Sequence, residues 1–174
     1  SGQGRKCSFE LTQDLWKGIS NSGFYTVPKD YQFFIVNDNE RKGGAEILNE
    51  YISQTYKKLH SMGVIPPTVH KIGLDSLTKR LLAPLPNKVN SSVFVIAVDG
   101  KVGDLLPEKQ IRLMKLLDEH GLSYRLFSYE NKNLIYSVSN HLVSSIQAVG
   151  GKPYILNLPY PEDFSKGAFI GIDL

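Results

Sequence analysis

The sequence has one cysteine and four scattered histidines in 174 residues. A single thiol, Cys7, cannot form an internal disulfide, and structural zinc sites take four regularly spaced cysteine or histidine ligands. No apolar run approaches the roughly 18 to 20 residues of a membrane span, and no signal peptide is evident. We therefore expect a cytoplasmic, monomeric protein with no membrane partner, no metal and no cofactor of its own.

The sequence also lacks the common nucleotide-binding and catalytic motifs. The loop 38–44 places glycines before a helix, but their spacing matches neither a Walker loop nor a dinucleotide fingerprint. We find no nucleophile elbow and no constellation of histidine, cysteine and aspartate. The net charge of +3, from 20 basic and 17 acidic residues, permits nucleic-acid binding without requiring it.

What the chain does contain is an alternation of strand and helix patterns. Apolar runs predict strands over 31–36, 68–74, 92–98 and 123–129, the third being the strongest. Helical periodicity predicts helices over 45–62, 76–82, 107–121 and 134–150, with Ser76 capping the second. Strands that read as continuous apolar runs are typical of a buried parallel sheet. The predicted fold class is α/β, a Rossmann-like parallel sheet sandwiched between helices.

The segment 106–155 carries the most specific pattern. In its first helix Ile111, Met114 and Leu117 form an apolar stripe that Gly121 ends. The second helix ends at Gly150-Gly151. Its buried side is apolar, and its other side is small and polar, with Ser137, Asn140, Ser144 and Gln147. Such a side is either a solvated surface or the floor of a site.

Three stretches in this order resemble the MID (middle) domain of Argonaute proteins. They are residues 120–127 (HGLSYRLF), 147–154 (QAVGGKPY) and 169–174 (FIGIDL), the last resembling the first strand of the PIWI nuclease domain. The resemblance implies that residues 1–30 end a preceding linker, 31–160 form the MID-like domain and 161–174 begin PIWI. It further implies a binding function. The partners would be a single-stranded guide DNA or RNA, held by its 5′ end, and the remaining Argonaute domains.

In that family two helices and the strand between them form a socket for the 5′-phosphate of the guide. Alignment on Gly121 places the socket positions at Gln110, Met114 and Arg125, and alignment on Gly150-Gly151 adds Ser144 and Ala148. Met114 and Ala148 stand where lysines are usual, so Arg125 is the one cation in the set. The departure implies a guide with a 5′-hydroxyl. The alternatives are a degenerate pocket, or a register shifted by one residue that would restore Lys109 or Lys115.

The loop after the strand would lie over the first base of the guide. There Tyr129 would stack on the base, Lys132 would meet a phosphate, and Asn133 would cap the second helix and read a base edge. Without the resemblance this loop is an ordinary surface turn. Asp173 matches the first PIWI carboxylate, so a divalent metal is expected in the full-length protein, while the fragment itself should not cut nucleic acid.

Two other functions stay open at this point. Ligands of open α/β sheets bind at the carboxyl ends of strands, so a Rossmann-like enzyme domain would hold a small phosphorylated substrate near Asp99 and Ser128. A scaffold domain would bind no oligonucleotide at any salt concentration. A guide socket should instead show salt-dependent binding, because phosphate contacts displace counterions.

Overall fold

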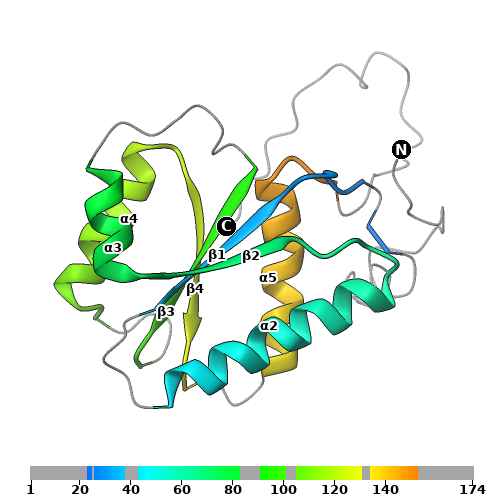
Figure 1. Ribbon diagram of the computed structural model, residues 1–174, viewed down its shortest axis with the longest axis horizontal. Helices are drawn as coiled ribbons and strands as arrows, with labels where there is room; N and C mark the ends of the chain where they lie inside the picture. The colour runs from blue at the N-terminus through cyan, green and yellow to red at the C-terminus, as the bar shows by residue number, and fades with distance from the viewer. Residues whose placement is uncertain are drawn as a thin grey trace, which may run out of the picture.

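Four parallel strands form one sheet in the order β2-β1-β3-β4 (Figure 1). The computed structural model describes residues 23–24, 26–37, 43–82, 91–100, 105–130 and 134–152. The strands are β1 (Gln32–Asn37), β2 (Thr68–Gly73), β3 (Ser92–Val98) and β4 (Ser123–Ser128). They alternate with the helices α2 (Gly44–Ser61), α3 (Leu74–Leu81), α4 (Glu108–Glu119) and α5 (Leu134–Ala148). The predicted α/β class is confirmed.

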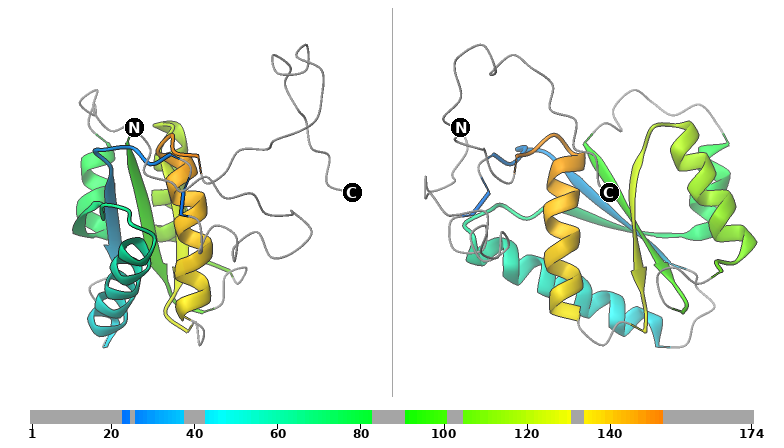
Figure 2. Two further views of the ribbon diagram at one scale, coloured as in Figure 1. Left: turned by 90° about the vertical axis from the view of Figure 1, so that its right-hand side faces the viewer. Right: turned by 180° about the vertical axis from the view of Figure 1, so that it is seen from behind.

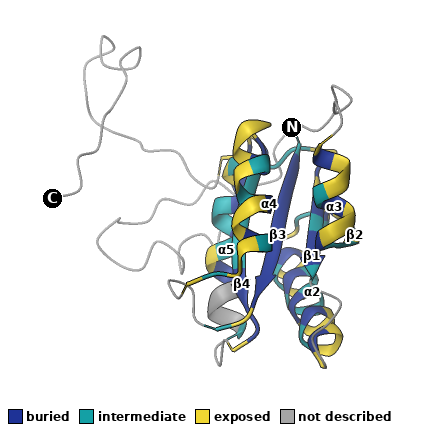
Figure 3. Cartoon of the chain, turned by 90° about the vertical axis from the view of Figure 1, so that its left-hand side faces the viewer, coloured by how far each residue is buried: buried dark blue, intermediate teal, exposed yellow. Residues whose placement is uncertain are grey.

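The sheet separates two apolar cores, one on each face. On one face α2 and α5 pack against alternate strand residues, among them Phe33, Val95 and Phe127. On the other face α3 and α4 pack against the residues in between, such as Phe94 and Ile96. Every residue of β3 is buried, whereas the outward sides of the helices are exposed (Figure 3). Since successive strand residues point to opposite faces, a central strand buried on both must be apolar throughout.

All eight predicted elements are present, with ends displaced by a few residues at most. Two predicted details are wrong. Helix α3 begins after Gly73, which makes no side-chain cap, so Ser76 lies inside the helix and does not cap it. In α4 the buried stripe is Gln110, Leu113 and Leu117, while Ile111 is 36% exposed. The stripe is rotated by one residue because Leu113, not Met114, points at the sheet.

The described residues before β1 pack onto the domain. Phe24 is buried in the core beneath α2 and α5. Thr26 pairs with Lys152 in an antiparallel bridge, with backbone hydrogen bonds of 2.9 Å in both directions. This bridge joins the segment before β1 to the segment that follows α5. The domain boundaries at 30 and 160 stay predictions.

Within the described residues, no helix combines the length and the apolar character needed to cross a bilayer.

Candidate functional site

Arg125 is the charged residue on the face of β4 that packs against α5. Phe127, two residues further along β4, is buried in the core on the same face. On the neighbouring strand β3, Arg125 is paired with Val95. The guanidinium is half-buried and is held by α5: Nε donates to Ser144 Oγ at 2.8 Å, and Nη2 donates to the Ser144 carbonyl at 2.9 Å. Nη1 donates to the Tyr124 carbonyl at 2.6 Å. The predicted neighbours Arg125 and Ser144 are therefore in direct contact.

The electrostatics of this cation are unusual. Its acceptors among the described residues are three neutral oxygens, and burial lowers the pKa of Arg125 from its ordinary value. A guanidinium has five N–H donors, of which these bonds use three. Among the described residues, these bonds leave one N–H on each terminal nitrogen without an acceptor, so the guanidinium can still donate to an oxyanion or a base edge.

Behind Arg125 lies a half-buried histidine, His141, that the sequence analysis did not single out. His141 Nδ1 is 3.1 Å from the hydroxyl of Tyr51, a residue of α2. Burial and the positive charge of Arg125 lower the pKa of His141 to about 4, and a backbone hydrogen bond with Leu126 opposes them. The imidazole is therefore neutral near pH 7, and it adds no second charge to the site. The sequence signal that could have indicated this residue is a single histidine on the apolar side of the predicted helix 134–150.

The Gly-Gly turn fixes the end of α5 next to this site. Gly150 has a positive φ of 85°, and the amide of Gly151 donates to the carbonyl of Ile146 at 2.8 Å. A Cβ on Gly151 would lie 2.5 Å from Ile146 Cγ2 and 2.9 Å from the Thr26 carbonyl. The turn is thus required by packing. Ala148, one of the predicted site residues, is half-buried and packs against the core.

The other half of the predicted socket belongs to α4, which covers the opposite face of the sheet. Met114 packs partly buried against the core of α3 and α4. Gln110 is 1% exposed, and its Oε1 has no hydrogen-bond partner within the described part of the chain. β4 is the outer strand of the described sheet, with α5 on one side of it and α4 on the other (Figure 2, right), so the two halves of the predicted socket lie on opposite faces of the sheet. The alternative cations of α4 are Lys115, which is exposed, and Lys109, which is half-buried.

Tyr129 lies in the core, 6% exposed, with its ring packed edge-on to Phe127 and close to the first residue of α2, Gly44. Stacking on a guide base stays a prediction that would require this ring to leave the core. Lys132, Asn133 and Asp173 lie outside the described residues.

The carboxyl ends of β3 and β4 were the expected place for a small phosphorylated substrate. Ser128 is buried there, and its hydroxyl donates to the carbonyl of Gly100 and accepts the amide of Glu130 at 3.1 Å. Asp99 is exposed, at the turn that leaves β3. The Ser128 hydroxyl is therefore occupied in closing the turn.

The fold and this site define an α/β Rossmann-like domain that presents a half-buried arginine beside its outer strand. The sequence matches no protein-family model. It is 26% identical over 188 residues, covering 97% of the chain, to a Piwi protein of Archaeoglobus fulgidus. The chain spans 39% of the length of that relative. This distant similarity supports an Argonaute/PIWI-type relationship.

Proposed function

We propose that this chain is the guide-binding module of an Argonaute-type protein, holding the 5′ end of a DNA or RNA guide in nucleic-acid-guided silencing or defence. The observation that carries the proposal is the geometry of Arg125. Its guanidinium is anchored on α5 by Ser144, and two of its N–H donors are not used by the hydrogen bonds it makes with the described residues. The similarity to an archaeal Piwi protein along nearly the whole chain supports the same assignment.

We further propose that the guide end is a 5′-hydroxyl. Met114 and Ala148 are apolar residues packed against the two cores, at positions where the resemblance implies lysines. A terminal phosphate carries nearly two negative charges, and one arginine neutralises only part of that charge. A hydroxyl end needs a donor or acceptor but no neutralisation. The single cation would then bind the first backbone phosphate or the edge of the first base.

In this proposal the module contributes binding and positioning, and the chain itself does not cut nucleic acid. Target cleavage, with a divalent metal near Asp173, belongs to the longer protein. The neutral state of His141 is part of the positioning, because a second positive charge behind Arg125 would repel it from its contacts with α5.

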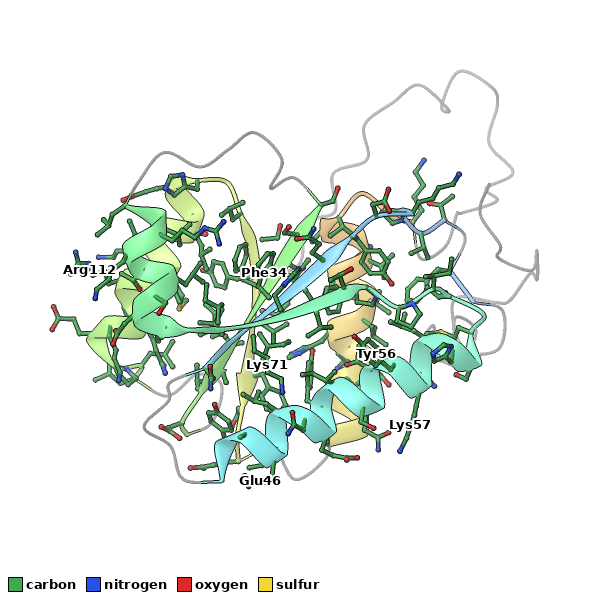
Figure 4. The ribbon with its side chains drawn as sticks, viewed as in Figure 1. Phe34, Glu46, Tyr56, Lys57, Lys71 and Arg112 are labelled. Atoms are coloured by element: carbon green, nitrogen blue, oxygen red, sulfur yellow. The ribbon has the colours of Figure 1, made fainter. Side chains whose placement is uncertain are left out.

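The test is a competition titration of short single strands that differ only in a 5′-hydroxyl or a 5′-phosphate, at two salt concentrations. We expect the hydroxyl strand to bind more tightly. Arg125→Gln should weaken binding by about 10- to 100-fold, the range for a hydrogen bond to a charged group. The matched control is Arg112→Ala, which removes an exposed arginine that projects from the outer side of α4 (Figure 4).

A clear preference for the 5′-phosphate would contradict the hydroxyl assignment, and Lys109→Ala and Lys115→Ala would then identify the residue that holds the phosphate. Equal binding of both ends, with no effect of Arg125→Gln, would contradict the socket itself.

A further inference from the structure

The guanidinium of Arg125 lies at one end of a series of contacts that crosses α5 and reaches α2. Arg125 Nε donates to Ser144 Oγ at 2.8 Å. That hydroxyl donates in turn to the backbone carbonyls of Asn140 and His141, at 3.1 and 3.2 Å. The imidazole of His141 contacts the hydroxyl of Tyr51, which is 1% exposed, at 3.1 Å from Nδ1. One turn of α5 therefore connects the proposed ligand site with a buried side chain of another helix.

The contacts of the imidazole assign its tautomer. The backbone hydrogen bond with Leu126 favours the protonated ring, so in this bond a ring N–H donates to the Leu126 carbonyl. A neutral imidazole has only one N–H, and its other nitrogen can only accept. We assign the proton to Nε2, which leaves Nδ1 to accept the hydrogen bond of the Tyr51 hydroxyl. The ring of His141 then ties α2 to β4 at the residue that follows Arg125.

The Tyr51 hydroxyl is a permanent donor. Its ring packs against Phe127, with the ring centroids 4.7 Å apart, and burial raises the pKa of Tyr51, so the hydroxyl keeps its proton near neutral pH. It can donate to a neutral imidazole but not to an imidazolium, which carries an N–H on both nitrogens. The hydroxyl therefore stabilises the neutral form of His141, in the same direction as the burial of the ring and the charge of Arg125.

The charged groups around His141 also disfavour a proton on the ring. Arg125 faces it from β4, and neither α5 nor β3 contains a carboxylate, a lysine or an arginine. On α2, Lys57 and Lys58 line a depression together with Ser139 of α5, two residues before His141. The ionisable residues of α2 besides Tyr51 and these two lysines are Glu46, Glu50, Tyr56 and His60. Among the described residues, the hydrogen-bond partners of the ring are a hydroxyl and a carbonyl, both neutral.

We propose that Tyr51 is a positioning residue for guide binding, which acts on Arg125 by holding His141 in its neutral form between α2 and β4. The inference rests on the proposed function, in which Arg125 contacts the guide. A proton on His141 would break the bond with Tyr51 and place a second positive charge behind the guanidinium, which would displace Arg125 from Ser144. Guide affinity thus depends on a side chain that is too deeply buried to touch the guide.

The test is the pH dependence of guide affinity, measured with the 174-residue chain and a 5′-hydroxyl oligothymidylate, whose bases take up no proton in mild acid. Wild-type affinity should fall as the pH approaches about 4, where His141 is protonated. Tyr51→Phe keeps the ring and removes only the donor to Nδ1, so the pKa of His141 should rise and the fall in affinity should begin about one pH unit higher. At about pH 4.5 the variant should bind about threefold more weakly than the wild type, with equal affinity at pH 7.

The matched control is Tyr31→Phe. It removes another buried tyrosine hydroxyl from the same core, one that donates to the Ile65 carbonyl at 2.9 Å. Its affinity profile should coincide with that of the wild type, and circular dichroism at each pH restricts the comparison to folded protein. A wild-type profile for Tyr51→Phe, or an equal shift for Tyr31→Phe, would overturn the proposal, because a purely structural hydroxyl changes stability without moving the titration of guide binding.

Arg125→Gln separates the two proposals. Unchanged affinity of this variant at pH 7 would overturn the proposed function and this inference with it. Weakened affinity of Arg125→Gln, without a shifted profile for Tyr51→Phe, would overturn only the role of Tyr51. The nitrogen-15 chemical shifts of the His141 ring in the wild-type protein provide an arm that needs no substitution, since a neutral ring with its proton on Nδ1 would also overturn the proposal.

Discussion

Replacing Gly151 by alanine should destabilise the domain more than any other glycine-to-alanine change in the turn after α5. The added Cβ would meet three atoms: Ile146 Cγ2 at 2.5 Å, the Ile146 carbonyl at 2.9 Å and the Thr26 carbonyl at 2.9 Å. Two of these atoms are backbone oxygens that already accept hydrogen bonds, from Gly151 and Lys152. They cannot retreat without lengthening those bonds.

The magnitude follows from two costs. Overpacking of this kind costs about 1 to 3 kcal/mol, and each weakened hydrogen bond adds about 1 kcal/mol. We therefore expect Gly151→Ala to lower the free energy of unfolding by about 3 kcal/mol. Gly150→Ala meets no atom within 4 Å and bears only the cost of a positive φ of 85°, about 1 to 2 kcal/mol. Gly121→Ala, with φ 64° and open space, is a second control of the same kind.

Urea denaturation followed by circular dichroism measures the three unfolding free energies. Hydrogen exchange locates the damage, because Gly151→Ala should expose the amides of Thr26 and Lys152 selectively. If Gly151→Ala cost no more than Gly150→Ala, the close approach between the turn and the segment before β1 would be refuted.

Two further perturbations test the packing around the site. The pKa of His141 is about 4 in the folded protein and about 6.5 when unfolded, so the unfolded state binds the extra proton between these values. Its contribution to stability, at most about 3 kcal/mol, should be complete above pH 6.5 and be lost as the pH falls toward 4; His141→Gln should flatten this part of the pH profile of the urea midpoint. Phe24→Ala should cost about 3 to 5 kcal/mol, because the ring is 2% exposed in the core, and a loss below 1 kcal/mol in urea denaturation would place it outside the folded unit.

The fold was predictable because its strands and helices follow simple periodicities. Ser92–Val98 is apolar throughout and became the fully buried strand, and the glycines at 63, 121 and 150 follow helices and adopt positive φ. The rotation of α4 was not predictable, since Ile111, Leu113 and Met114 offer three overlapping stripes. In the structure Leu113 faces the sheet, and Gln110, one turn earlier on the same side of α4, is buried although it is polar.

The candidate site was predictable only in part. The contact between Arg125 and Ser144 follows from their places on neighbouring elements, and the resemblance pointed to both. The burial of Tyr129 depends on the missing side chain of Gly44, which lies far away in the sequence. The pairing of Tyr51 with His141 joins residues 90 positions apart. Contacts between elements so distant in the chain leave no local pattern, because they arise from how α2 and α5 cross.

A substitution at Arg125 can distinguish a role in folding stability from a role in guide binding. Among the described residues the acceptors of this half-buried cation are all neutral, so it loses hydration without gaining an ion pair from them, and an aliphatic residue here would pack at least as well against Phe127 and α5. We therefore expect Arg125→Leu to change the free energy of unfolding by less than about 1 kcal/mol, or to raise it, while guide binding is lost. A loss of about 3 kcal/mol or more in urea denaturation would show that the three hydrogen bonds of the guanidinium are structural. Arg125 would then have the structural role of attaching α5 to β4, and this result would contradict the proposal that it binds a ligand.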